Sequence, residues 1–542
     1  MLFPERGRGV SADTEVLPPP AERRTASSGS LVGVFVRRHW LFLALFAAGV
    51  GLRLVTQYAY RPVLLNSAEY LFSAEHLRPG NVHPVAYPVF LRILPLEDGL
   101  TIVSALQHVF GLAIAVLIYA VLLRLGVRAW LAALGAAPAL LDAYQLGIEQ
   151  YVTPEALFEL FLVGGCAAIL WKRPAPMLLL GLAGVLFALA TITRTIGFFV
   201  LVPAVLTVIF MRIGWSRVVV LVLCFLVPLA GYAVWYHSYH DKYAITGSTG
   251  KFLYARVSPF ADCAQFEVPR YERVLCLEEP PGERLPVNEL LWSPQYSPLA
   301  KVNPPRATTH DDVARDFAKR AIRAQPGAYA RDVGADVLRA FQPTRELAPG
   351  EYGEPPWEFH KGYPIFFRGS ICSRESFRQV RADLAIRGNE IAAGRVAGCA
   401  QRRQRMIDYL ELHGDEPATN ATLISFLRGY QNVGYAPGPL LAACMLAGFA
   451  AALGLGRARR SGLRSAAFLF SGAGAVVCLG SVLVAVFSWR YQIPQLVLLP
   501  PAGAIAVAAF FGTRGESAAR FELESAGAEE ASPFRDSGQW DP

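Results

Sequence analysis

The residues best suited to chemistry lie in an unusually apolar stretch between positions 59 and 98. It places the carboxylates of Glu69 and Glu75 among leucine and aromatic neighbours, with Asn66 and His83 nearby. A carboxylate held against apolar surface binds its proton more tightly, which suits a general base acting near neutral pH. Glu69 is therefore a candidate base, and His83 is a candidate for a catalytic or substrate-binding role. The alternatives are that both glutamates line the wet face of an interfacial helix and that His83 is a structural cap.

A second group of acids falls where two apolar segments meet. Asp142, Glu149, Glu155 and Glu159 lie within eighteen residues, and acids at membrane depth usually mark a site because they are costly there. Glu155 follows a Thr-Pro pair, so it is expected in the first turn of a helix, where the helix dipole favours a carboxylate without any further role. Asp142 needs either a function or a buried partner such as an arginine.

Two arginines, Arg194 and Arg490, lie in short gaps between apolar segments. Guanidinium groups match phosphate oxygens bidentately, so these residues predict a phosphate-binding site. The alternative is that they pair with Asp142 or a glutamate, or bind lipid headgroups. Lys242 and Arg256 are weaker candidates of the same kind.

The elements that must position these residues are transmembrane helices. Of the 542 residues, 53% are hydrophobic and only 17% are charged. A stretch of about twenty apolar residues spans a bilayer as a helix, because a helix satisfies its own backbone hydrogen bonds in lipid. Ten such spans are predicted, at 40–58, 101–122, 129–146, 154–171, 176–193, 196–212, 217–237, 437–455, 465–487 and 493–512.

Every second gap between these spans carries basic residues. The positive-inside rule therefore predicts that both termini are cytoplasmic and that the remaining gaps, including 59–98, face outward. The net charge of +8 is explained by this pattern, so a nucleic-acid partner is not expected. The basic residues are Arg37, Arg38, Arg124, Arg128, Lys172, Arg173, Arg212, Arg217, Arg457, Arg459, Arg460, Arg464 and Arg514.

The predicted fold class is an α-helical polytopic membrane protein with a mixed extracytoplasmic insert. Its expected parts are a disordered cytoplasmic tail, a first membrane domain, the insert, three last spans and a second disordered tail. The insert should contain an amphipathic helix near 311–340 that Pro326 breaks or kinks. The five parts are 1–36, 37–238, 239–436, 437–513 and 514–542.

Cysteine usage agrees with this organisation. Four of the eight cysteines fall inside apolar spans, and the other four fall in the outward insert, where an oxidising compartment favours two disulfides. Of the three connectivities that four cysteines allow, the local one is favoured. A zinc site is the alternative, but the usual C-x-x-C spacing is absent. The favoured pairs are Cys263 with Cys276 and Cys372 with Cys399.

Several segments together resemble the GT-C superfamily of membrane glycosyltransferases, which use polyprenyl-phosphate sugars. The nearest branch is the one that contains bacterial aminoarabinose and protein-mannosyl transferases. The resemblance covers about half of the chain. The segments are NSAEYLFSAEHL from Asn66, HPVAYPVFLRILP from His83, TPEALFELFL from Thr153, ATITRTIGFFVLVPA from Ala190 and WRYQIPQLVLLPPAGA from Trp489.

The resemblance implies inverting transfer of a sugar from a polyprenyl-phosphate donor to an envelope lipid, glycan or protein, at the outer face of a bacterial plasma membrane. Family members usually carry an aspartate near the start of the first outward loop, where this chain has Asn66, so Glu69 is expected to act as the base. Arg194 and Arg490 would stabilise the departing lipid phosphate. Asp142 or Glu155 would hold a divalent metal ion if one assists.

Two other functions fit the same topology. A transporter or flippase of an envelope lipid or glycan predicts polar residues near mid-membrane, broken helices and internal symmetry. A non-catalytic envelope scaffold predicts an insert that only binds a partner. The gathering of ionisable residues at one predicted face favours the enzyme.

Overall fold

The computed structural model describes residues 28–64, 67–96, 99–292, 296–347, 355, 357–362 and 419–512. The chain divides into two compact units, Met1–Trp40 and Leu41–Pro542, and the contacts described below lie within the second. Asn66, Cys372, Cys399 and almost all of both predicted tails lie outside the described residues.

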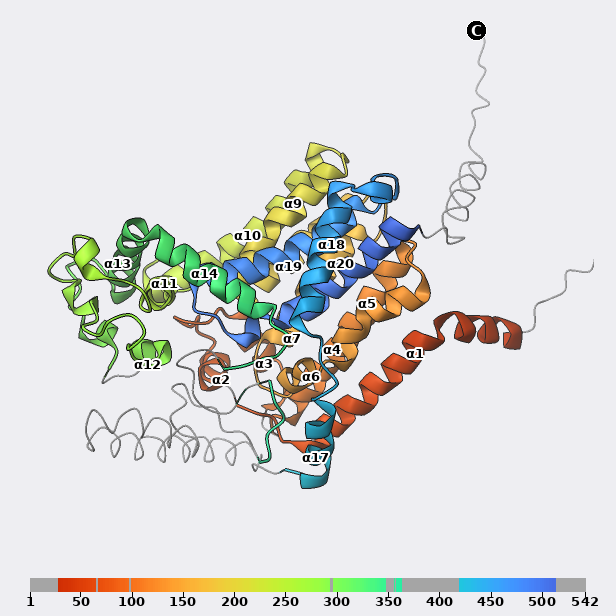
Figure 1. Cartoon of the computed structure of the whole chain (residues 1–542), viewed down its shortest axis with the longest axis horizontal. Helices are drawn as coiled ribbons and strands as arrows, with labels where there is room; N and C mark the ends of the chain where they lie inside the picture. The colour runs from red at the N-terminus through yellow and green to blue at the C-terminus, as the bar shows by residue number, and fades with distance from the viewer. Residues whose placement is uncertain are drawn as a thin grey trace, which may run out of the picture. The chain divides into compact units, whose positions relative to one another are not determined.

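Helices occupy the ten apolar segments, as expected for an α-helical membrane protein (Figure 1). Within the described residues, five helical segments are long and apolar enough to span a bilayer, namely Gly33–Ala59, Thr101–Arg124, Trp215–His240, Arg464–Val484 and Trp489–Phe511. A bent pair, Ala129–Leu141 and Ala143–Glu149, would make a sixth. The helices are α1 (Ser28–Ala59), α4 (Thr101–Arg124), α5 (Ala129–Leu141), α6 (Ala143–Glu149), α7 (Glu155–Leu170), α8 (Met177–Thr193), α9 (Leu201–Phe210), α10 (Trp215–His240), α18 (Gly438–Leu453), α19 (Arg464–Val484) and α20 (Ile493–Phe511).

The remaining apolar helices are shorter than a full span. They are α8, α9 with the 3₁₀ turn η2 (Thr195–Val200) before it, α18 and the sixteen-residue α7. The total of ten crossings therefore stays a prediction. What the structure supports is a membrane-embedded helical protein.

Small residues let these helices pack closely. Helix α8 packs against both α7 and α10, and α18, α19 and α20 pack against one another. A Cβ at Gly184 in α8 would lie 2.4 Å from the backbone oxygen of Leu221 in α10. Gly184 is therefore required for this approach, as is common between helices in membranes.

The basic helix ends predicted to face the cytoplasm lie together. Arg124 donates to the backbone oxygen of Trp171 at 2.7 Å, and Arg173 donates to that of Gly462 at 2.6 Å. Arg217 reaches the backbone oxygen of Ala175 at 3.1 Å. The charge pattern thus corresponds to one end of the packed helices, while the side of the membrane remains a prediction.

The described part of the insert is helical. Its helices are connected by short 3₁₀ turns, and the described residues contain two isolated β-bridges but no strand ladder. The expectation of a mixed insert is wrong for this part, because its apolar residues recur at helical spacing. The helices are α11 (Thr249–Val257), α12 (Val287–Trp292), α13 (His310–Ala324), α14 (Pro326–Ala340) and α17 (Ala421–Tyr430).

The predicted amphipathic helix is two helices that meet at Gln325. Pro326 occupies the first turn of α14, where its missing N–H costs nothing. Helix α13 begins with a capping box between Thr309 and Asp312, and Lys242 donates to Asp312 at 2.7 Å. Burial acts to raise the pKa of Asp312, but the hydrogen bonds from Lys242 and Thr309 outweigh it and hold that pKa well below its usual range. Lys242 therefore fixes the start of α13.

Buried charges tie the insert to the membrane helices. Asp336 of α14 pairs with Arg256 of α11 and with Arg339, and it accepts a hydrogen bond from the backbone N–H of Phe487 at 3.2 Å. Both α11 and α14 contact α19 (Figure 1). Arg256 thus has a structural role rather than lining a phosphate site.

The predicted disulfide between Cys263 and Cys276 is present, with a Cα–Cα distance of 6.0 Å. It closes a short loop between α11 and α12. The cysteines placed in apolar spans are free thiols, as expected for small apolar fillers. They are Cys166, Cys224, Cys444 and Cys478.

If the insert faces an oxidising compartment, the Cys263–Cys276 bond should form in cells. Non-reducing peptide mass spectrometry of protein trapped with a thiol-blocking reagent should yield the two cysteine peptides linked. Cys166 and Cys478 should carry no disulfide in the same sample. Recovery of Cys263 as a blocked free thiol would contradict the predicted sidedness.

Candidate active site

Three charged residues from different helix ends meet at one carboxylate oxygen. Glu155, at the start of α7, is completely buried. Its Oε1 accepts from Arg194 Nη1 at 2.9 Å and from Arg490 Nε at 2.7 Å, and Arg490 Nη2 also contacts it. The expected pairing of the two arginines with a glutamate is therefore present, and the phosphate-binding role remains a proposal.

Local breaks in the helices put the arginines there. Helix α8 ends at Arg194, which has an extended backbone conformation before η2 begins. Arg490 lies in the 3₁₀ turn η7 (Trp489–Tyr491) between α19 and α20. Glu155 follows Pro154 in the first turn of α7, so the positive end of the helix dipole adds to the arginine charges.

Two buried tyrosines extend this cluster. Tyr70 lies on α2 (Ser67–His76) in the first predicted outward loop and interacts electrostatically with Arg490, Glu155 and Arg194. Burial raises the pKa of Tyr70 to about 12, so its phenol stays protonated and can donate a hydrogen bond. Tyr144 interacts with the same charges, and its buried hydroxyl makes no hydrogen bond to the described residues.

The cluster carries excess positive charge, because two guanidiniums share one carboxylate. A buried charge is stable only when it is balanced and hydrogen-bonded. Arginines so arranged, with a phenol beside them, have the donor groups that an anion with several oxygens, such as a phosphate, requires.

Glu69 and His83 face each other across the first predicted outward loop. His83 Nε2 lies 3.7 Å from Glu69 Oε2, and both side chains are partly exposed. The His83 ring packs against Tyr70, with a centroid distance of 4.6 Å. Tyr70 thus connects a partly exposed carboxylate and imidazole to the arginine cluster. By contrast, Glu75 is 76% exposed and lies on the outer face of the same helix, away from Tyr70.

Asp142 is held in a structural position. Its Oδ1 caps α6 by accepting the backbone N–H of Tyr144 at 2.9 Å, and its Oδ2 accepts that of Ala436 at 2.7 Å. Arg345 of the insert pairs with it at 3.4 Å. Asp142 therefore has an arginine partner, which was the alternative to a functional role, and this arginine comes from the insert.

A second buried network lies among α1, α4, α6 and α7, and its cationic members were not predicted. Arg53 binds both carboxylate oxygens of Glu149, at 2.9 and 2.8 Å, and His108 Nδ1 lies 2.8 Å from Glu149 Oε2. Gln145 donates to both Glu149 and Glu159, at 3.1 and 2.8 Å. The sequence did contain a signal for this network, because Arg53 and His108 each lie inside a predicted apolar span.

The described residues give the suggested metal ion no support. Among them, no group of three or more His, Cys, Asp or Glu side chains lies close enough to hold an ion together. Asp142 and Glu155, the suggested ligands, are both paired with arginines.

No family model, curated protein or solved structure shows a significant match to the chain.

Removing the charge of Glu155 should destabilise the protein, since two largely buried guanidiniums would lose their shared, fully buried partner. Breaking a buried ion pair in this way costs about 3–5 kcal/mol. Glu155→Gln should therefore lower the unfolding temperature in detergent micelles by several degrees. Glu75→Gln, a change at an exposed glutamate, is the control and should have no effect; equal stability of the two variants would contradict the buried triad.

Proposed function

We propose that the protein is an integral membrane glycosyltransferase, similar to the GT-C superfamily, that transfers a sugar from a polyprenyl-phosphate donor to an extracytoplasmic acceptor with inversion. One observation carries the proposal. Arg194 and Arg490 converge on Glu155 beside Tyr70, and Tyr70 belongs to the loop that holds Glu69 and His83. An anion site and a candidate base thus share one end of the helices.

The arginine cluster would bind the donor phosphate. Arg194 and Arg490 are 16% and 18% exposed, so their hydration is reduced but they are not fully enclosed. Charge that develops on a leaving phosphate is stabilised most by fixed cations in such a partly dry site. The protonated phenol of Tyr70 would add a hydrogen-bond donor.

Glu69 would act as the base, with His83 orienting it. The acceptor hydroxyl gives its proton to Glu69 while its oxygen forms a bond to the anomeric carbon. The bond between that carbon and the phosphate oxygen breaks, and the phosphate leaves with the bonding electrons on the face opposite the attack. Sugar configuration is inverted, and the lipid phosphate remains at the arginines.

The site lies at the helix ends predicted to face outward. A lipid-linked donor would approach from the bilayer, and the acceptor would come from outside. The proposed location is the plasma membrane of a bacterium, with the catalytic face outside. A lipid donor is consistent with the absence of a dinucleotide or P-loop fingerprint in the sequence.

A transporter is the second candidate, because the bent pair α5–α6 and the Arg53–Glu149–His108 network are features that it predicts. The network members nevertheless lie near helix ends. Arg53 is six residues before the end of α1, and His108 is seven residues after the start of α4. At about 1.5 Å per residue this depth is about 10 Å, short of the centre of a hydrocarbon core about 30 Å thick.

Glu69→Gln should reduce sugar transfer by about 100-fold or more, because a positioned general base contributes about 10²–10⁴-fold. The measurement is transfer from a synthetic polyprenyl-phosphate sugar by protein purified in nanodiscs. Glu75→Gln, on the exposed face of the same helix, is the matched control and should keep full activity. If Glu69→Gln and Glu75→Gln are equally active, Glu69 is not the base, although the enzyme class would stand.

A further inference from the structure

The first predicted outward loop and the insert together line an open cavity of about 420 Å³. This volume falls within the range of about 300–1,000 Å³ that is usual for small-molecule sites. Four segments contribute its walls: the turn before His83, the start of α11, the region of α12 and the start of α13. The lining residues are Asn81, Val82, Gly247, Ser248, Lys251, Leu291, Trp292, Ser297, Leu299, Ala300, His310 and Asp311.

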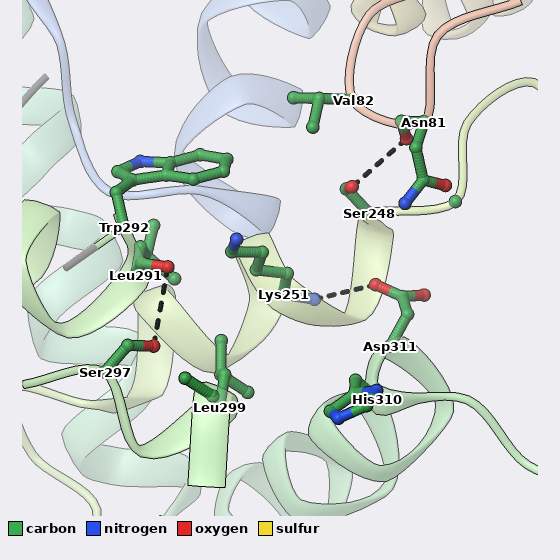
Figure 2. Close-up of a pocket in the computed structure, with 12 residues that line it drawn as sticks. Asn81, Val82, Ser248, Lys251, Leu291, Trp292, Ser297, Leu299, His310 and Asp311 are labelled. Carbon is green, nitrogen blue, oxygen red and sulfur yellow. Dashed lines mark hydrogen bonds between the residues drawn. The ribbon is translucent and has the colours of Figure 1, made fainter. Parts of the chain in front are cut away.

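The cavity has an apolar side and a polar side. In Figure 2, Trp292 and Leu291 lie opposite Ser248 and Asp311, with Lys251 between them. The Lys251 ammonium lies 3.7 Å from the centroid of the indole ring, and Asp311 is held by the backbone N–H of Lys251 at 2.9 Å. A ligand therefore meets an aromatic wall, a cation, a carboxylate and a hydroxyl within one pocket.

The charged groups of this cavity lie on two walls. Asp311 accepts the backbone N–H of Lys251 and pairs with Arg315 at 2.7 Å, while the Lys251 ammonium lies over Trp292. The cavity therefore does not present a pair of guanidiniums to one anion, as the arginine cluster does. Ring C–H groups would instead pack on Trp292, and hydroxyls would exchange hydrogen bonds with the surrounding donors and acceptors. That combination suits a sugar ring.

One turn joins this cavity to the proposed base. Asn81 and Val82 line the cavity, and His83 follows them directly. On the other side of the turn, a Cβ at Gly80 would lie 3.2 Å from Glu69 Oε1, so the Glu69 carboxylate packs against the same backbone.

The turn is held firmly in place. The backbone N–H of Gly247 and the hydroxyl of Ser248 donate to the backbone oxygen of Asn81, at 2.9 and 3.1 Å. Tyr236 donates to the Asn81 side chain at 3.1 Å. A ligand in the cavity would therefore lie at a fixed position relative to Glu69.

We propose that this cavity is the acceptor subsite and that it seats a hydroxyl-bearing sugar ring, from either a glycolipid headgroup or a glycan chain. The inference rests on the proposed glycosyltransferase function. A peptide acceptor is disfavoured because the described residues offer no strand edge with which an extended peptide could pair.

The test separates donor cleavage from transfer. Nanodisc-embedded protein receives a radiolabelled synthetic polyprenyl-phosphate sugar, first alone and then with one of three envelope fractions: glycolipid, soluble glycan or protein. Hydrolysis of the donor by water needs no acceptor, whereas transfer does. The variants are Trp292→Ala, Trp292→Phe and Lys251→Met, and the controls are the exposed insert changes Tyr271→Ala and Lys301→Met.

Trp292→Ala should lower transfer at limiting acceptor by about tenfold, which corresponds to about 1.4 kcal/mol of lost aromatic contact, while donor hydrolysis is unchanged. Lys251→Met should lower transfer less, and the controls should match wild type. Label in the lipid extract identifies a glycolipid acceptor, and label in the soluble glycan identifies a glycan acceptor. If Trp292→Ala does not fold, Trp292→Phe and Lys251→Met decide the result.

Three results would overturn the inference. Unchanged transfer by the cavity variants would show that the acceptor binds elsewhere, while the enzyme class stands. Label in the protein fraction alone would refute a sugar acceptor. Wild-type protein that neither hydrolyses nor transfers the donor would refute the proposed function itself, and the acceptor role with it.

Discussion

The ion cluster in which two arginines share the buried carboxylate of Glu155 is the interaction around which the candidate site is built. A charge without a partner at this depth would cost several kilocalories per mole, so each member requires the others. Arg194 and Arg490 can reach Glu155 only because α8 and α19 end where they do and short 3₁₀ turns follow. The helix breaks and the ion cluster therefore explain one another.

The insert is part of this arrangement rather than an appendage. Arg345 pairs with Asp142 at the bend between α5 and α6, and it also donates to Gln492 at 2.7 Å, two residues from Arg490. Asp336 joins α14 to the segment after α19. The insert thus fixes the geometry of the helix ends that hold the charged cluster.

Local patterns in the sequence were sufficient to predict the helices, the break at Pro326 and the pairing of Cys263 with Cys276. Hydrophobic periodicity, a proline and sequence proximity are all local properties. The partners of the buried charges could not be predicted, because Arg53 and Glu149 are separated by 96 residues and no short motif connects them. Arg345 lies farther still from Asp142, in a segment with an ordinary soluble composition. The role of Asn66 also stays a prediction, since it lies outside the described residues.

The fate of a lipid-linked sugar distinguishes an enzyme from a carrier most directly. Purified protein in sealed vesicles, supplied with a synthetic polyprenyl-phosphate sugar labelled in both its lipid and its sugar, can either cleave the donor or move it between leaflets. If the protein is a glycosyltransferase, the two labels should separate, with free polyprenyl phosphate accumulating in the vesicles, and Arg490→Ala should slow this separation. An intact donor that appears in the opposite leaflet without separation of the labels would contradict the glycosyltransferase function and establish a transporter.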